Sequence, residues 1–133
     1  MRPLRSSPAN DESVSRFIFS SRFFSATKSQ VKGKAFEPSD RDNSTSVFRI
    51  IGLTEEQIWY LGHHFVAQNR TSSLRARADV SVSVINNLQL RLVPDEPPPR
   101  HANITGWPEE KDRRMSLAQL LAAEATLVLE KDA

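Results

Sequence analysis

The chain has 133 residues, no cysteine and a formal net charge of +2. That length suits a single domain with its own hydrophobic core. The lack of cysteine excludes disulfides, thiolate chemistry and cysteine-ligated metal sites, and it suits a reducing compartment, so we expect a cytoplasmic protein. No apolar run approaches the roughly 20 residues of a membrane helix, so we expect no membrane association.

The start of the chain differs from the rest in composition and charge. Residues 1–13 contain prolines and serines with almost nothing apolar, which predicts a disordered tail ahead of a single domain over residues 14–130. The same start has the arginine and serine content of transit peptides, although Asp11 and Glu12 argue against a targeting segment. Residues 1–49 carry nine lysines and arginines against five acidic residues. This basic front mildly favours a polyanion partner, and the simpler explanation is a solvated surface of mixed sign.

The first half of the chain predicts strands and then one helix. Phenylalanines and β-branched residues over 14–25 predict a strand, which Ser20 and Ser21 can interrupt. Residues 28–38 predict a loop or a short edge strand, and residues 46–51 a clear strand.

The best local signal follows that strand. Thr54 and Gln57 have the spacing of a capping box, in which each side chain bonds the backbone of the other residue. They predict a helix over residues 55–67, with one apolar face docked on the sheet.

Residues 80–92 have two interpretations. Valines and leucines alternate with polar residues, which predicts a hairpin whose three-residue loop is 85–87. The alternative is a short helix over 76–85 followed by one strand.

The last third of the chain completes an α+β fold. Residues 94–99 predict a polyproline-like link, residues 101–105 a short strand, and residues 108–129 a helix with Pro108 in its first turn. We therefore expect a mostly antiparallel sheet of four or five strands covered by two helices.

The segment from Pro97 to Pro108 concentrates polar and aromatic side chains between proline boundaries. His101 is the candidate catalytic residue, because imidazole serves as a general acid or base near neutral pH. Strand alternation would place Asn103 beside it and Arg100 on the opposite face. A structural histidine that fixes the proline-rich link is the alternative interpretation.

Further candidate binding residues are Trp107, near the end of this segment, and two arginines that precede it in the sequence. Trp107 could stack on a nucleobase, or it could close the core at the start of the helix. Arg75 and Arg77 would share a strand face with Asp79, where they could hold a phosphate or form a row of surface ion pairs.

Lys32 and Lys34 belong to the basic front, in which cations are interleaved with phenylalanines. That pattern is typical of a nucleic-acid-binding face, and also of a sheet core with its charges outside.

We expect neither a metal nor a cofactor. His63 and His64 are neighbours on the predicted helix, point about 100° apart, and cannot chelate a metal as an i, i+4 pair does. The chain also lacks phosphate-loop, dinucleotide-binding, nucleophile-elbow, zinc-protease and EF-hand motifs.

Several segments together resemble a group of short, uncharacterised bacterial proteins. These are residues 46–50, 58–62, 76–79 and the run Arg100-His101-Ala102-Asn103-Ile104-Thr105-Gly106-Trp107-Pro108. The resemblance covers residues 16–128. It implies a bacterial, cytoplasmic, single-domain protein, and it carries over no activity, cofactor or catalytic residue.

These patterns favour a non-enzymatic binding module for a protein partner or nucleic acid, because no catalytic set is visible. The alternative is a small hydrolase of RNA or a phosphoester, with His101 as general base and Arg75, Arg77 or Arg100 as phosphate clamp. Convergence of His101, Arg77 and Trp107 on one concave pocket would favour the hydrolase, and a flat basic face the binding module.

Overall fold

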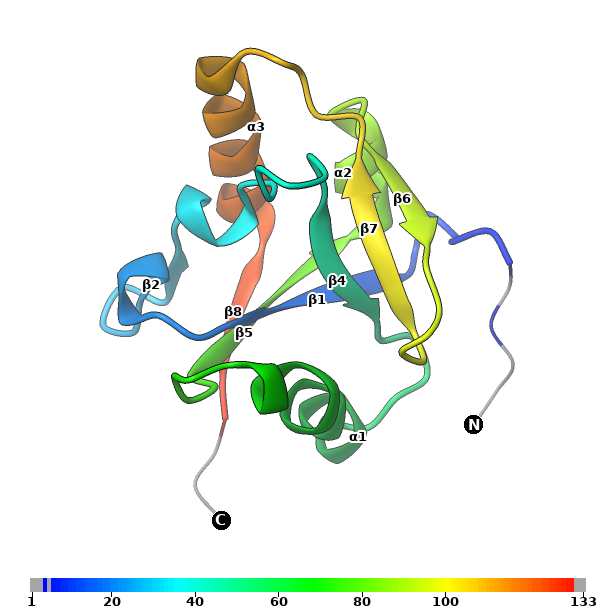
Figure 1. The fold of residues 1–133 in the computed structure, drawn as a ribbon, viewed down its shortest axis with the longest axis vertical. Helices are drawn as coiled ribbons and strands as arrows, with labels where there is room; N and C mark the ends of the chain where they lie inside the picture. The colour runs from blue at the N-terminus through cyan, green and yellow to red at the C-terminus, as the bar shows by residue number, and fades with distance from the viewer. Residues whose placement is uncertain (1–3, 5, 131–133) are drawn as a thin grey trace.

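The computed structural model describes residue 4 and residues 6–130. A six-stranded antiparallel sheet lies at the centre of this part of the chain. The strands of this sheet are β1 (Ser13–Ile18), β4 (Thr45–Arg49), β5 (Ala76–Ser81), β6 (Arg91–Pro94), β7 (His101–Thr105) and β8 (Thr126–Leu129). They lie in the order β6-β7-β4-β1-β5-β8, and each neighbouring pair is antiparallel. The predicted α+β class is confirmed, although the sheet has six strands rather than four or five (Figure 1).

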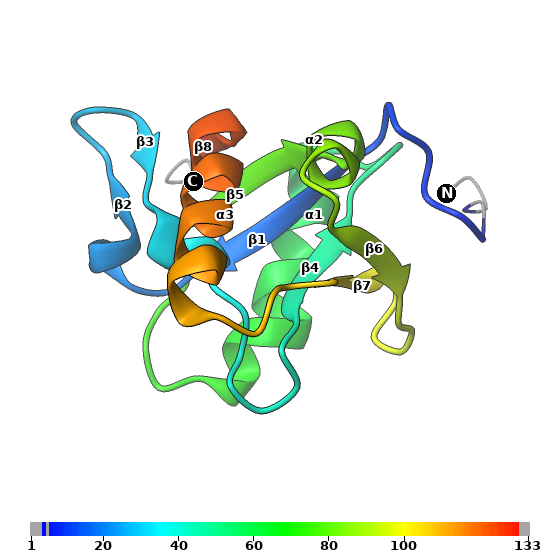
Figure 2. The ribbon, with the colours of Figure 1, turned by 90° about the horizontal axis from the view of Figure 1, so that it is seen from above.

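Helices cover both faces of this twisted sheet (Figures 1 and 2). One face carries α2 (Val82–Asn87), α3 (Lys111–Glu124) and the short helix η2 (Gly33–Phe36), and the other carries α1 (Glu55–Leu61) and the π-helical turn η3 (Gly62–Val66). The described residues thus form three α-helices, where we expected two. The remaining short elements are η1 (Ser21–Phe23), β2 (Phe24–Ser25), β3 (Gln30–Val31) and η4 (Ala67–Asn69).

Each face of the sheet has its own hydrophobic core. The larger core lies under α2 and α3 and includes Phe36, Ile85 and Leu121, all fully buried. The smaller core lies under α1, where the rings of Phe17 and Phe48 meet at 5.7 Å between centroids. Burial of apolar surface at about 25 cal/mol per Å² on both faces holds the two layers of helices to the sheet.

Helix α1 begins where the capping box places it. Thr54 Oγ1 accepts from the Gln57 backbone N–H at 3.2 Å, and the Gln57 side chain accepts from the Thr54 N–H at 3.0 Å. The regular α-helix ends at Leu61, and the chain continues through η3 and η4 to Asn69. A Cβ on Gly62 would lie 2.7 Å from the Phe17 ring, so only glycine allows this close approach of helix and sheet.

Replacing Thr54 by alanine is expected to lower the free energy of unfolding by about 1 kcal/mol, because the Gln57 N–H loses its cap. Urea denaturation measures the change. Thr71→Ala, at an exposed loop position, is the matched control and is expected to change stability by less than about 0.5 kcal/mol. Equal effects in the two variants would mean that the cap contributes nothing.

The predicted hairpin over 80–92 is wrong. Strand β5 ends at Ser81, whose hydroxyl accepts from the Val84 N–H at 3.3 Å and caps helix α2. Val82 and Ile85 lie three residues apart and are both buried on one helix face, at 1% and 0% exposure. The alternative, a short helix followed by one strand, has the right elements but places the helix over residues that form β5.

The predicted helix over 108–129 is too long at both ends. It begins at Lys111, and it stops at Glu124 because the Ala125 N–H turns back to the Ala122 carbonyl at 3.2 Å. Residues 126–129 form strand β8 at the edge of the sheet, paired with β5. Threonine and valine at these positions favour a strand once a partner edge is present.

The predicted tail over 1–13 also needs correction. Residues 1–3 and 5 lie outside the described part of the chain, but the end of the segment is fixed in the fold. Ser13 opens β1, and the Glu12 carboxylate forms a buried ion pair with Arg49. Within the described residues, no helix is both long enough and apolar enough to cross a membrane.

Candidate functional site

His101 lies in a chain of polar side chains on the sheet surface. Its Nε2 is 2.6 Å from Ser46 Oγ on the neighbouring strand β4. Its Nδ1 is 2.9 Å from the backbone carbonyl of Asp95 and 3.4 Å from the carboxylate of the same residue. The Asn103 side-chain amide donates to that carboxylate at 3.0 Å. A serine, a histidine and an aspartate are thus aligned in series.

The sheet register explains how residues distant in sequence meet here. Ala102 and Ile104 are fully buried in the larger core, so strand alternation turns His101 and Asn103 to the opposite face, as predicted. Strand β4 pairs with β7 so that Ser46 opposes Asn103, which puts Ser46 diagonally across from His101.

The loop between β6 and β7 brings Asp95 to the histidine. The predicted polyproline-like link is a hairpin loop instead, since Pro94 pairs with Ala102 and the His101 N–H bonds the Pro98 carbonyl at 3.1 Å. The Asp95 N–H also donates to the His101 carbonyl at 2.9 Å, which fixes the two residues to each other.

The hydrogen bonds select one tautomer of His101. Because the Asp95 carbonyl can only accept, Nδ1 carries the proton, and the Nε2 lone pair faces the Ser46 hydroxyl. The Phe48 ring meets the imidazole edge to face at 5.4 Å and limits its rotation. Ser46 is exposed, so its Oγ is open to a ligand while it donates to a base. This is the geometry of an activated nucleophile.

Arg100 takes no part in this cluster. It is 4% exposed, and its Nη1 donates to the Ile51 carbonyl at 2.5 Å and to the Arg49 carbonyl at 3.4 Å. Burial, and then the charge of Arg49, lower the pKa of Arg100, while Glu12 and Glu96 oppose that shift. Arg100 precedes β7 and has a φ of 71°, so the strand alternation that we predicted for it does not apply. Its guanidinium is kept from the His101 cluster by its bond to the Ile51 carbonyl instead.

Arg77 is buried beneath α1, at 2% exposure. It donates to Glu55 at 2.7 Å and to Asp79 at 3.1 Å, and it lies over the Trp59 ring at 4.9 Å. Burial lowers the pKa of Arg77, but its hydrogen bonds to these carboxylates and their negative charges outweigh burial and raise the pKa overall. The residue ties α1 to the sheet. It pairs with Asp79 as the ion-pair interpretation predicts, but the row is not on the surface because Arg77 is buried. Arg75 is exposed and donates to the Phe19 carbonyl at 3.3 Å.

Trp107 belongs to the larger core. Its indole is 5% exposed and donates to the Ile104 carbonyl at 3.0 Å, which leaves no ring face free for a nucleobase. His101, Arg77 and Trp107 therefore do not converge on one pocket. Lys32 and Lys34 are exposed at the start of η2, and Lys34 lies 3.7 Å from Glu37.

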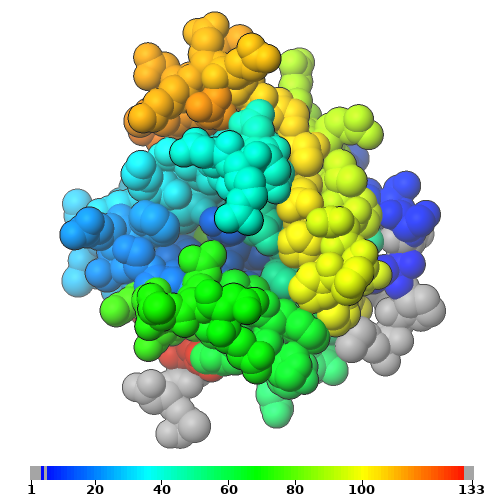
Figure 3. Space-filling view, viewed as in Figure 1, coloured from blue at the N-terminus to red at the C-terminus, as the bar shows by residue number. Residues whose placement is uncertain are grey.

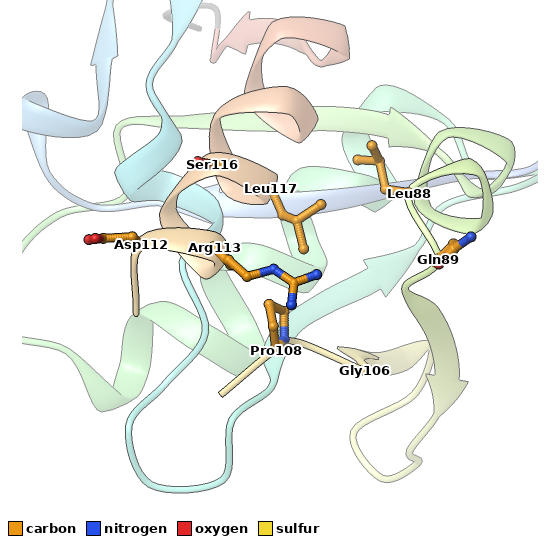
Figure 4. Close-up of a pocket in the computed structure, with 8 residues that line it drawn as sticks. All are labelled: Leu88, Gln89, Gly106, Pro108, Asp112, Arg113, Ser116 and Leu117. Carbon is orange, nitrogen blue, oxygen red and sulfur yellow. The ribbon is translucent and has the colours of Figure 1, made fainter. Parts of the chain in front are cut away.

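A separate pocket lies between α2 and the start of α3 and has a volume of about 390 Å³ (Figure 4). Arg113 extends into it toward Pro108, beside the apolar side chains of Leu88 and Leu117, whereas Asp112 points away. None of the residues that the sequence singled out as binding or catalytic lines this pocket.

Sequence reasoning found His101 and Asn103 but missed Ser46 and Asp95. Ser46 is one of many serines in the chain, and Asp95 follows a strand whose position was mispredicted. Only the pairing of β4 with β7 and the closing of the β6–β7 loop bring them together.

Metal binding has no support in the described residues, which contain no group of three or more histidine, aspartate or glutamate side chains that could hold an ion. Comparison with protein-family models, curated proteins and solved structures gave no match. The geometry around His101 is therefore the basis for assigning a function.

Proposed function

We propose that the protein is a small serine hydrolase, with Ser46 as nucleophile and His101 as general base. The observation that carries this proposal is the 2.6 Å contact between Ser46 Oγ and His101 Nε2, with Nδ1 held by Asp95. Serine, histidine and aspartate side chains in this order recur on unrelated folds that cleave esters and amides. Here Nδ1 bonds the backbone carbonyl of Asp95, and the carboxylate of the same residue lies 3.4 Å from Nδ1. This proposal differs from the hydrolase of RNA or a phosphoester considered from the sequence, because the pocket of His101, Arg77 and Trp107 that would favour that enzyme does not form. Only the general base is shared, and the nucleophile and the orienting acid are new.

The reaction would proceed in two steps. Ser46 Oγ attacks the carbonyl carbon of an ester while its proton passes to His101 Nε2, and the same proton leaves with the alcohol as the carbon–oxygen bond breaks. Water then attacks the acyl-enzyme, again giving a proton to Nε2, and the carboxylic acid is released with Ser46 regenerated. The Asp95 carboxylate, 3.4 Å from Nδ1, stabilises the imidazolium formed in each step.

Activated aryl esters are the first substrates to test, because their leaving groups need little stabilisation. Hydrolysis of p-nitrophenyl acetate and butyrate would be measured for the wild type and for Ser46→Ala and His101→Asn. We expect each substitution to reduce kcat/KM by about 10³-fold, as for loss of a nucleophile or general base. A serine-directed phosphonyl fluoride should also label Ser46 in the wild type, as read by peptide mass.

The control is Ser116→Ala, an exposed serine on α3, which should retain full activity. If Ser46 and His101 only stabilise the sheet, Ser46→Ala will change the melting temperature and leave hydrolysis at the wild-type level. That result, or labelling that persists in Ser46→Ala, would reject the proposed nucleophile.

The binding module is a second candidate function. It is supported by the exposure of Lys32 and Lys34, with Lys28 and Arg22 exposed nearby in the sequence. A basic surface of this kind suits nucleic acid, and its binding would weaken steeply with salt.

A further inference from the structure

A hollow with two arginines opens on the face of the molecule shown in Figure 3, where the blue and cyan segments meet the green one. It has a volume of about 200 Å³ and contains neither Ser46 nor His101. The residues that matter to its chemistry are Arg16, Phe19, Ser20, Phe23, Arg70 and Ser72.

Arg16 has a fixed position at the base of the hollow. Strands β1 and β4 pair at Ser15 and Phe48 and then separate, and the Arg16 guanidinium lies in the gap. Its Nε donates to the Ala35 carbonyl at 2.9 Å and its Nη1 to the Ser46 carbonyl at 2.8 Å. These neutral acceptors orient the guanidinium without neutralising its charge.

Arg70 brings a second cation to the same place. Its guanidinium lies 4.5 Å above the Phe19 ring centroid. Among the described residues, no carboxylate lies within ion-pair distance of Arg16 or Arg70. Burial, and then the charge of Arg70, lower the pKa of Arg16 to about 10, which leaves Arg16 charged at neutral pH. Two like charges therefore share a small hollow.

We propose that this hollow binds the phosphate group of a small phosphate monoester. Guanidinium groups match the oxygens of a phosphate in geometry and charge, and a dianion would relieve the repulsion between Arg16 and Arg70. Ser20 Oγ accepts from the Arg22 N–H at 3.2 Å and keeps its own proton to donate, and Ser72 offers a second hydroxyl.

The apolar wall of the hollow would contact the group that carries the phosphate. Phe19 and Phe23 line this wall. A water molecule takes about 30 Å³ in the liquid, so the hollow has room for a phosphate and the first part of its ester. An aromatic monoester should consequently bind more tightly than inorganic phosphate.

The test is titration calorimetry of the full chain with phenyl phosphate and inorganic phosphate at low salt. We expect saturable binding of both, with phenyl phosphate the tighter, and at least a 10-fold loss of affinity in Arg70→Gln. Arg70 is exposed, so this variant should keep the fold, as checked by thermal melting. Arg91→Gln is the matched control, because it removes the same charge from an exposed arginine on the edge strand β6, outside the hollow. We expect it to bind like the wild type.

Three results would overturn the proposal. One is the absence of saturable binding, and another is an equal loss of affinity in Arg91→Gln and Arg70→Gln, which would show only general attraction of anions. A single-stranded oligonucleotide without a terminal phosphate that binds as tightly as phenyl phosphate would also overturn it, in favour of a polyanion surface. Ser46→Ala should bind phenyl phosphate normally, so this inference and the proposed hydrolase fail separately.

Discussion

Replacing Glu12 by glutamine is expected to lower the free energy of unfolding at neutral pH by about 3–5 kcal/mol, as for loss of one partner of a buried ion pair. The Glu12 carboxylate accepts from Arg49 Nε at 2.6 Å and Nη2 at 3.0 Å, and from the Ala9 N–H at 2.9 Å. The side chains of Glu12 and Arg49 are 2% and 3% exposed. Glutamine would leave the Arg49 charge buried beside that of Arg100, without its counter-ion.

The same pair sets the expected response to acid. Burial by itself raises the pKa of Glu12, but the hydrogen bonds from Arg49 and the Ala9 N–H, with the charges of Arg49 and Arg100, bring it below its ordinary value of 4.5. A carboxyl with a lowered folded pKa stabilises the protein fully above its unfolded pKa, and this stability is lost as the pH falls through the folded pKa.

Urea denaturation of wild type and Glu12→Gln at several pH values measures both effects. The difference in unfolding free energy should be constant above pH 4.5 and shrink below it. Glu37→Gln is the control, because Glu37 pairs with the exposed Lys34 at 3.7 Å and should change stability by less than about 1 kcal/mol. If Glu12→Gln lowered the free energy of unfolding by less than about 1 kcal/mol at neutral pH, the desolvation cost of burying Glu12 and Arg49 would equal the stabilisation that the ion pair provides.

The elements predicted correctly from the sequence are those with strong local causes. The capping box at Thr54 and Gln57 requires only four residues, and it starts α1 in the structure as expected. The strand over 101–105 follows from alternation between core and surface, which the buried Ala102 and Ile104 bear out.

The elements predicted wrongly depend on distant partners. The sequence of residues 126–129 is compatible with the end of a helix and with a strand. They form a strand because the edge of β5 is available to pair with them. Residues 82–87 alternate as a strand would, but Ser81 caps a helix and both Val82 and Ile85 are buried on its inner side. Tertiary contacts override local pattern in both places.

The candidate site was predictable only in part for the same reason. His101 stood out in the sequence because of its neighbours, whereas Ser46 and Asp95 became its partners through strand register and loop closure. The residues of the arginine hollow come from β1, η1, η2 and the segments after β1 and η4, so no motif joins them.

Replacing Trp107 by alanine is expected to lower the free energy of unfolding by about 3–5 kcal/mol, which is the usual cost of removing a buried aromatic side chain. The indole is 5% exposed, packs in the larger core beside α3 and donates to the Ile104 carbonyl at 3.0 Å. Alanine would leave a cavity and remove that hydrogen bond. Urea denaturation again measures the loss.

Tyr60→Ala is the control for this substitution, because Tyr60 is 56% exposed and should cost far less. Binding of a single-stranded oligonucleotide distinguishes a packing role of Trp107 from a role in recognising nucleic acid. The affinity should be equal for wild type and for Trp107→Ala under conditions where both are folded. A variant that kept its stability but lost oligonucleotide binding would mean that the indole leaves the core to stack on a base. The segment that contains Trp107 therefore has two roles, which explains its density of polar and aromatic residues. Trp107 packs into the larger core, and His101 faces Ser46 on the other side of the sheet.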